Sequence, residues 1–346
     1  MLRGGRWRAL LVIPLLVAAV LLFVFHGPNW HLVHDAFTIV RWRWVIAAIG
    51  LNLLSVLARA LSWDTTIKQS LDPPVPRFAL VFSAFSVGLF AHAVHPGRVG
   101  ELARVAVLRR RLPGRTGATA TLIGSVFAHR MFDVFPATLL VVWVLFTAKI
   151  PGWALTSIAL VLVLGIALFA LAMMLARRAH RDAPEGLGAV RQLVARARLG
   201  LAVLRSPVAA ATAASFQCLG WFCQLLAVWS TMYAFHIHTP LSTAGLVLVL
   251  INVATIVPLW PGNFGLVQVA VAVPLVSYGV PYARGFAFGI GLQAIEASVG
   301  VGVGLIFLAR EGLSYAMLKT IDKPVEASEK ALEEEEIARA RTGVTG

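Results

Sequence analysis

The sequence has little charge: only 13% of its 346 residues are Asp, Glu, Lys or Arg, whereas 59% are hydrophobic. A water-soluble domain of this length must cover its surface with polar side chains, so the composition excludes a typical soluble protein. Several apolar runs reach the roughly 20 residues that a helix needs to cross a bilayer. The sequence therefore predicts an all-α polytopic membrane protein.

Cysteine is also scarce, with Cys218 and Cys223 five positions apart in one apolar run. Five residues along a helix place two side chains on different faces, so the spacing favours neither a disulfide nor a metal-binding pair. The nucleotide-binding pattern Gly-x-x-x-x-Gly-Lys-Ser/Thr does not occur, which argues against ATP-driven pumping by this chain. No cofactor is expected.

The net charge of +14 is the next feature that limits the function. No zinc-finger spacing, RNA-binding signature or basic helix with heptads accompanies it, so nucleic acid is not expected as a partner. In a membrane protein, excess Lys and Arg mark the cytoplasmic side and attract anionic headgroups. We expect the partner to be a membrane lipid that is anionic or carries a phosphate.

Two kinds of apolar segment can be distinguished. Six are long enough for full spans: 9–25, 44–62, 117–147, 153–176, 208–235 and 284–309. Two further regions, 78–110 and 242–277, are each interrupted by a Pro-Gly pair. Proline removes a backbone donor and glycine tolerates a reversal, and such a break at membrane depth survives only inside protein or beside a wet cavity. These two regions are therefore predicted to be re-entrant hairpins.

The basic residues orient these segments in the cell membrane. With the N-terminus inside, the expected cytoplasmic segments carry 18 Lys and Arg and the expected outer segments carry 4. The cytoplasmic segments are 1–8, 63–77, 98–115 and 177–205. Both termini are then cytoplasmic, and residues 9–25 form an uncleaved signal anchor. Tryptophans near the proposed span ends fit interfacial positions: Trp7, Trp30, Trp42, Trp44 and Trp63.

The order of spans and hairpins predicts an inverted repeat. Two spans, an inside hairpin and a third span are followed by two spans, an outside hairpin and a third span. The two breaks also match in sequence, since HPGRVGE at 95–101 and WPGNFGLVQ at 260–268 share Pro-Gly-x-x-Gly. Interrupted segments in corresponding halves favour a transport site near the bilayer midplane.

The first break is followed by Arg98, Glu101 and Arg104, which share one face of a helix that begins after Pro96-Gly97. Glu101 could neutralise one arginine and leave the other for a phosphate, which Arg binds through two N–H groups. We therefore expect a half-helix that faces a wet cavity, and the alternative is an ordinary basic helix end at the cytoplasmic surface.

Three further charged positions lie inside predicted spans, where charge is costly. Arg130 and Asp133 are an i,i+3 pair suited to an internal salt bridge or to locking two helices together. Arg59 could extend its side chain to the nearby interface. Glu296 has no opposite charge in its own helix, so it must be protonated, paired across helices or exposed to water.

The second break supplies uncharged polar groups. Asn263 and Gln268 offer hydrogen bonds, and Gly265 allows close approach of the backbone. A half-helix that begins after Pro261 and Gly262 would direct its free amides at a ligand near the midplane, a favourable place for an anion.

The motifs PGRVGELARVAVLRRR, HRMFD and PLWPGNFGLVQVAVAVPLVSYGV together resemble the flippase-like transmembrane region of lysylphosphatidylglycerol synthases, across about residues 10–310. The resemblance implies a lipid-translocating domain with two re-entrant segments. The positions that match its motifs are Pro96, Gly97, Arg98, Gly100, Glu101, Arg104, Arg130, Asp133, Pro261, Gly262 and Gly265.

The sequence departs from that family pattern at two positions. His129 and Gln268 stand where glutamate is usual, so the second predicted hairpin lacks a carboxylate. We do not expect this chain to contain the aminoacyltransferase domain of the full synthases. We expect residues 1–310 to form the transmembrane domain and residues 311–346, which hold eight acids with Arg310 just before them, to form an acidic cytoplasmic tail, helical or disordered.

These observations favour a membrane protein that flips a phosphate-bearing lipid, such as a phospholipid or a polyprenyl-phosphate-linked sugar, and that is not an enzyme. One alternative is a membrane glycosyltransferase that uses polyprenyl-phosphate sugars, with His31, His34 and Asp35 as a weak metal cluster. Another is a non-transporting scaffold. A lipid-modifying enzyme is a possible partner in either case.

Overall fold

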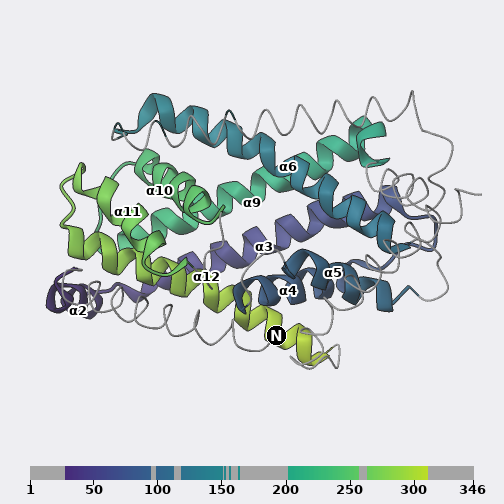
Figure 1. Cartoon of the computed structure of the whole chain (residues 1–346), viewed down its shortest axis with the longest axis horizontal. Helices are drawn as coiled ribbons and strands as arrows, with labels where there is room; N and C mark the ends of the chain where they lie inside the picture. Colours follow the sequence, from purple (N-terminus) through teal and green to yellow (C-terminus); the bar gives the residue numbers. More distant parts are fainter. Residues whose placement is uncertain are drawn as a thin grey trace, which may run out of the picture.

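The structure is a computed structural model that describes residues 28–94, 99–112, 118–150, 202–256 and 263–310, with single positions 152, 156 and 163. These residues form helices and the turns between them, and no strand occurs among them (Figure 1). The predicted spans 9–25 and 153–176 and the tail 311–346 fall wholly or mostly outside the described residues.

Four helices are long and apolar enough to cross a membrane within the described part of the chain. They are α3 (Trp42–Ser70), α6 (Ala118–Thr147), α9 (Pro207–Ala234) and α12 (Tyr282–Arg310). At 1.5 Å per residue, 28 to 30 residues extend over about 42–45 Å, more than the roughly 30 Å of a hydrocarbon core. The prediction of a polytopic α-helical membrane protein is confirmed.

The start of the described chain holds a helix that the sequence did not predict. Helix α2 (Trp30–Thr38) lies where an outer loop was expected. Its N-cap is Asn29, whose side-chain oxygen accepts from the backbone N–H groups of His31 at 3.1 Å and Leu32 at 3.4 Å. Trp30 packs edge-on against Phe286 of α12, with 5.9 Å between ring centres.

Helix α3 continues eight residues beyond the predicted end at position 62. Trp63 therefore lies inside the bundle and is fully buried, so the interfacial position predicted for it is wrong. Its indole N–H donates to Ser125 Oγ of α6 at 3.2 Å, which satisfies the polar end of the buried ring.

Helices α3 and α9 pack as a central antiparallel pair. Ser55 Oγ donates to the Gly220 carbonyl at 2.8 Å, and Ser62 Oγ donates to the Ala213 carbonyl at 2.9 Å. Small residues let the two backbones approach this closely, which is how helices associate where no water drives them together. The pair runs through the middle of the view in Figure 1.

Two pairs of short helices pack around this centre. Helix α4 (Phe78–Val94) packs on α5 (Val99–Arg110), and α10 (Leu241–Ala254) packs on α11 (Leu266–Val276). The pairs lie toward opposite ends of the long axis of the molecule (Figure 1). A short 3-10 helix, η1 (Ala202–Arg205), precedes α9.

The residues that connect each pair are mostly outside the described part of the chain. Of the predicted site residues, this applies to Pro96, Gly97, Arg98, Pro261 and Gly262. The backbone reversals predicted at these positions therefore stay predictions.

The helix contacts of the two halves correspond to one another. Helix α4 packs on α12 and α10 packs on α6, so each short pair contacts the last long helix of the other half. Helix α5 packs on α6 as α11 packs on α12, and α3 contacts α4 and α6 as α9 contacts α10 and α12. These contacts among the long and short helices of one half thus have counterparts in the other, whereas those of α2 and η1 have none among the described residues.

Candidate functional site

The middle of the four long helices carries a concentration of polar side chains. Glu296 is the central residue of α12, and Asp133 and Trp221 lie beside the centres of α6 and α9. Arg59 lies within one turn of the centre of α3. If these helices cross a bilayer, all four residues lie near its midplane.

Asp133 accepts three side-chain hydrogen bonds, more than the other polar residues at the middle of these helices. Its carboxylate accepts from Arg130 Nη1 at 3.2 Å, from Trp221 Nε1 at 2.9 Å and from the side-chain amide of Gln217. Its side chain is 16% exposed. Because a carboxylate accepts several hydrogen bonds at once, this one residue ties α6 to α9.

The internal Arg130–Asp133 pair predicted from the sequence is confirmed, and Arg130 also binds α5 in the first of the two interrupted regions. Arg130 Nε donates to Glu101 Oε1 at 2.7 Å, which links α6 to α5. Glu101 was expected to hold Arg98 or Arg104. Arg98 lies outside the described residues, and within them the ion pair of Glu101 is with Arg130 on the neighbouring helix and not with Arg104.

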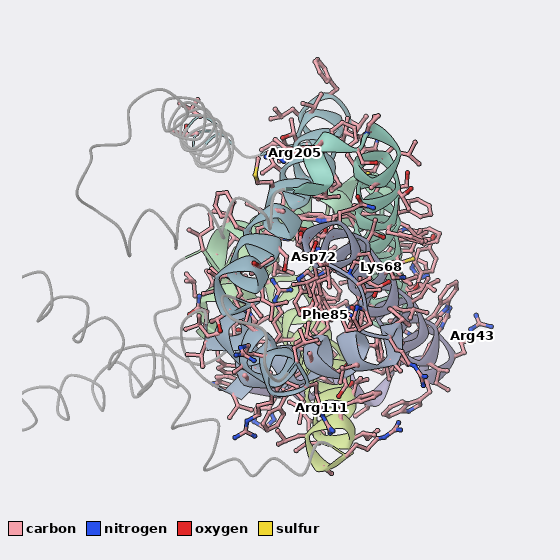
Figure 2. All side chains as sticks on the ribbon, turned by 90° about the vertical axis from the view of Figure 1, so that its right-hand side faces the viewer. Arg43, Lys68, Asp72, Phe85, Arg111 and Arg205 are labelled. Carbon is pink, nitrogen blue, oxygen red and sulfur yellow. The ribbon has the colours of Figure 1, made fainter. Side chains whose placement is uncertain are left out.

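Arg104 does not face a wet cavity, contrary to the prediction. Its side chain is buried, and its guanidinium lies over the Trp63 ring at 4.8 Å and near the Phe85 ring at 5.6 Å from their centres. Figure 2 shows Phe85 within the bundle and Arg43 directed away from it. The aromatic faces stabilise the cation in place of an acid, so Arg104 is an internal packing residue in this structure.

His129 lies in the same cluster and is buried at the edge of the Phe85 ring, with 6.1 Å between ring centres. Its Nδ1 atom has no hydrogen-bond partner among the described residues. His129 and Arg104 thus both lie against the Phe85 ring.

Arg59 was expected to reach the interface, and this is wrong. Its Nη2 donates to the side-chain oxygen of Gln224, and its guanidinium lies 5.4 Å from the ring centre of Trp221. Gln224 Nε2 in turn donates to Glu296 Oε1 at 3.5 Å. Of the alternatives left open for Glu296, the structure shows a contact across helices, made through an uncharged amide.

These contacts form one continuous series, here called the polar chain. It contains Glu101, Arg130, Asp133, Gln217, Trp221, Arg59, Gln224 and Glu296. Helices α5, α6, α9, α3 and α12 each contribute to it. The chain holds two arginines and three acids, and buried Arg104 nearby brings the formal charges into balance.

Sequence reasoning missed the members that α9 supplies. Gln217, Trp221 and Gln224 are spaced by four and three residues, so they share one face of α9. Each is a side chain that can donate a hydrogen bond, placed in an apolar span. That spacing was the available sign of a polar face on α9. It is a weaker indication than a charged residue, because uncharged polar side chains are tolerated more readily in a membrane span.

The predicted polar residues of the second hairpin are used within the fold. Asn263 donates from its side-chain amide to the Ala254 carbonyl at 2.8 Å, at a positive φ of 43°. Gln268 accepts from the Gly265 N–H at 2.6 Å and donates to Gln293 of α12 at 2.7 Å. Helix α11 therefore begins at position 266, later than predicted, and its first turn is closed by its own side chains.

The residues proposed as a weak metal cluster do not form one in the described part of the chain. His34 Nδ1 lies 3.7 Å from Asp35 Oδ1, with both side chains largely exposed, and no group of three potential ligands occurs among the described residues. Cys218 and Cys223 are free.

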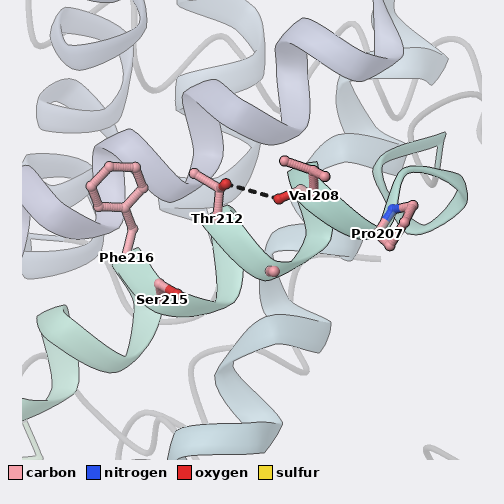
Figure 3. Close-up of a pocket in the computed structure, with 6 residues that line it drawn as sticks. Pro207, Val208, Thr212, Ser215 and Phe216 are labelled. Carbon is pink, nitrogen blue, oxygen red and sulfur yellow. Dashed lines mark hydrogen bonds between the residues drawn. The ribbon is translucent and has the colours of Figure 1, made fainter.

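A shallow groove lies on the outer face of the first turns of α9, away from the residues above (Figure 3). It is lined by Pro207, Val208, Ala211, Thr212, Ser215 and Phe216. The Thr212 hydroxyl is occupied by a hydrogen bond to the Val208 carbonyl at 2.8 Å. These residues carry no charge, so the groove is not a candidate phosphate site.

A bundle of long apolar helices with ion pairs at its centre defines a polytopic membrane protein with a polar interior. Residues 2–304 match the family model of the lysylphosphatidylglycerol synthase TM region, and the chain belongs to that family. The family resemblance predicted from the motifs is thereby confirmed. Comparisons with curated proteins and with solved structures found no match.

Proposed function

We propose that this protein binds a phosphate-bearing lipid at Arg130 and moves it between the leaflets of the cell membrane. The supporting observation is the state of the Arg130 side chain, which is 49% exposed although it sits near the middle of a long apolar helix. Glu101 and Asp133 hold Nε and Nη1, which leaves Nη2 without a recorded acceptor in the described residues. A fixed guanidinium with a free edge is suited to a phosphate.

The arrangement of the short helices supports a transport role. We interpret α4–α5 and α10–α11 as re-entrant hairpins that enter from opposite sides, related by an inverted repeat. The exchanged packing of α4 on α12 and α10 on α6 supports this interpretation. In inverted-repeat transporters the substrate site lies at the repeat interface near the midplane, which is where the polar chain lies.

Transport rather than catalysis also suits the chemistry of the polar chain. Asp133 accepts three hydrogen bonds and Glu101 is engaged by Arg130, so the two carboxylates that contact Arg130, the proposed phosphate ligand, are both held as acceptors. A general base needs a carboxylate free to take a proton from its substrate. The lipid is then carried unchanged, and a separate lipid-modifying enzyme would supply or use it.

Lipid transfer in proteoliposomes tests this function. The wild-type chain is expected to accelerate inter-leaflet transfer of fluorescent phosphatidylglycerol over protein-free vesicles. Arg130→Gln should bind this lipid about tenfold to a hundredfold more weakly, through loss of a charge-assisted contact of about 1.5–3 kcal/mol. Arg77→Gln, outside the polar chain, is the matched control and should behave as wild type. Equal binding by Arg130→Gln and wild type would exclude Arg130 as the phosphate ligand.

The predicted topology gives a second test. With both termini cytoplasmic, a single cysteine at position 114 should react with an impermeant maleimide from the cytoplasmic side, and one at position 280 from the outside. A chain without Cys218 and Cys223 provides the background. Labelling of position 114 from outside would contradict the prediction that the first hairpin enters the membrane from the cytoplasmic side.

A further inference from the structure

Along the axis of α12, Glu296 lies between the positions at which the two Pro-Gly-interrupted regions pack on this helix. On α12, the start of α11 packs at Gly289, where an added Cβ would lie 3.1 Å from the Gln268 Cα. The end of α4 packs at Gly300, where an added Cβ would lie 3.9 Å from Ala93. Glu296 therefore lies between the levels at which the two short-helix pairs break, on a long helix that contacts both pairs.

The hydrogen bond to Glu296 is weak and can be reversed. Gln224 Nε2 donates to its carboxylate at 3.5 Å, the long limit for a hydrogen bond, while Gln224 Oε1 accepts from Arg59. A side-chain amide carries both a donor and an acceptor. If the Glu296 carboxyl gains a proton, its O–H can donate to Gln224 Oε1. That oxygen then accepts hydrogen bonds from both Glu296 and Arg59.

Protonation also changes the charge balance. The polar chain together with Arg104 contains three arginines, and Glu101, Asp133 and Glu296 supply three negative charges. Adding a proton to Glu296 leaves one positive charge without compensation. A phosphodiester carries one negative charge, so binding of one such lipid restores the balance.

We propose that Glu296 is a proton-binding site coupled to lipid binding, so that one proton and one lipid phosphate occupy the protein together. This rests on the function proposed above and adds its energy source, since an inward or outward proton gradient would then drive the lipid. Proton binding makes Arg59 share its amide acceptor with Glu296, and the less firmly held cation, which is linked to Asp133 through Trp221, becomes available to the phosphate bound at Arg130. Because the coupling is reciprocal, lipid binding must favour proton uptake.

Few ionisable side chains face Glu296 from the described helices that pack on α12. Helix α3 supplies Arg59, and α4 supplies His92, which has a contact of its own. Helix α9 faces it with uncharged Gln224, and α11 contains no ionisable side chain. The ionisable residues of α2 lie near the start of α12, beside Phe286, and so about ten residues from Glu296.

The experiment measures binding of fluorescent phosphatidylglycerol to the full chain in phosphatidylcholine nanodiscs, from about pH 5 to pH 8. The headgroup of this phosphodiester keeps its charge throughout that range. For wild type, the dissociation constant should fall about tenfold as the pH falls. Glu296→Gln, which mimics the protonated side chain, should bind tightly at every pH, and Glu296→Asp should keep the dependence.

A second variant distinguishes Glu296 from His129 as the source of the pH dependence. An ordinary histidine titrates at about pH 6.5, so His129→Asn should keep the wild-type pH profile if Glu296 is responsible. In weakly buffered solution, lipid binding should take up protons in wild type and none in Glu296→Gln.

Each other result has a defined meaning. Measurable binding with a flat wild-type profile would overturn the coupling and leave the proposed function standing. A dependence that survives in Glu296→Gln would also overturn it, whether or not it disappears in His129→Asn. Absence of phosphatidylglycerol binding at every pH would instead contradict the proposed function, and the coupling with it.

Discussion

Asp133→Asn is expected to lower the free energy of unfolding by about 3 kcal/mol and to abolish lipid transfer. The substitution preserves the shape of the side chain but removes the charge that faces Arg130. With the amide N–H₂ at the Oδ1 position, Trp221 Nε1 and Gln217 Nε2 both lose their acceptor, and with it at the Oδ2 position Arg130 Nη1 does. Whichever way the amide turns, at least one donor of the polar chain loses its acceptor.

The measurement is unfolding of the purified protein in mixed detergent micelles, followed by intrinsic tryptophan fluorescence, together with transfer in proteoliposomes. Asp35→Asn is the matched control, because the Asp35 side chain is 71% exposed, and it should change neither stability nor transfer. Wild-type stability of Asp133→Asn would mean that the carboxylate contributes no net stabilisation to the bundle. Loss of transfer at unchanged stability would still support a role in binding.

Much of the architecture was predictable because it depends on periodicity and length. Four of the predicted spans appear as long helices, and the two interrupted regions appear as pairs of short helices. These features follow from the length of apolar runs and the position of Pro and Gly. The end of α3 was missed because the segment after position 62 is more polar, although Trp63 is buried by packing against α6.

The partners within the site could not be predicted in the same way. Arg130–Asp133 is local, one turn apart, and the sequence was sufficient to find it. Glu101 and Arg104 are also one turn apart, yet Glu101 binds Arg130 while Arg104 lies over aromatic rings. The choice between a local and a distant partner depends on which helices lie alongside, and that depends on the tertiary packing.

In the proposed inverted repeat, the two halves place an acid at equivalent positions with different surroundings. Asp133 lies beside the middle of α6 and Glu296 in the middle of α12, and these helices correspond in the proposed repeat. Asp133 receives three hydrogen bonds, whereas Glu296 has one long bond recorded among the described residues. We interpret the first acid as a fixed organising residue and the second as the one free to exchange a proton.

Gly100→Ala is expected to destabilise the protein by about 3 kcal/mol, because it adds a methyl group where two helices touch through their backbones. A Cβ at Gly100 would lie 2.3 Å from the Gly88 carbonyl oxygen and 2.9 Å from His92 Cβ. Since the nearest atom is backbone, relief requires α5 to move away from α4. Glu101 is the next residue, so the same movement would pull its carboxylate from Arg130 and reduce lipid transfer.

Gly302→Ala provides the comparison on α12, because no atom of the described structure lies within 4 Å of a Cβ added there. Its stability should stay within about 1 kcal/mol of wild type, the size of the helix-propensity difference between glycine and alanine. Unfolding in mixed micelles and transfer in proteoliposomes would be measured for both variants. If Gly100→Ala matched Gly302→Ala in both assays, the close packing of α4 on α5 would not be what positions Glu101, and the first hairpin would need a different account.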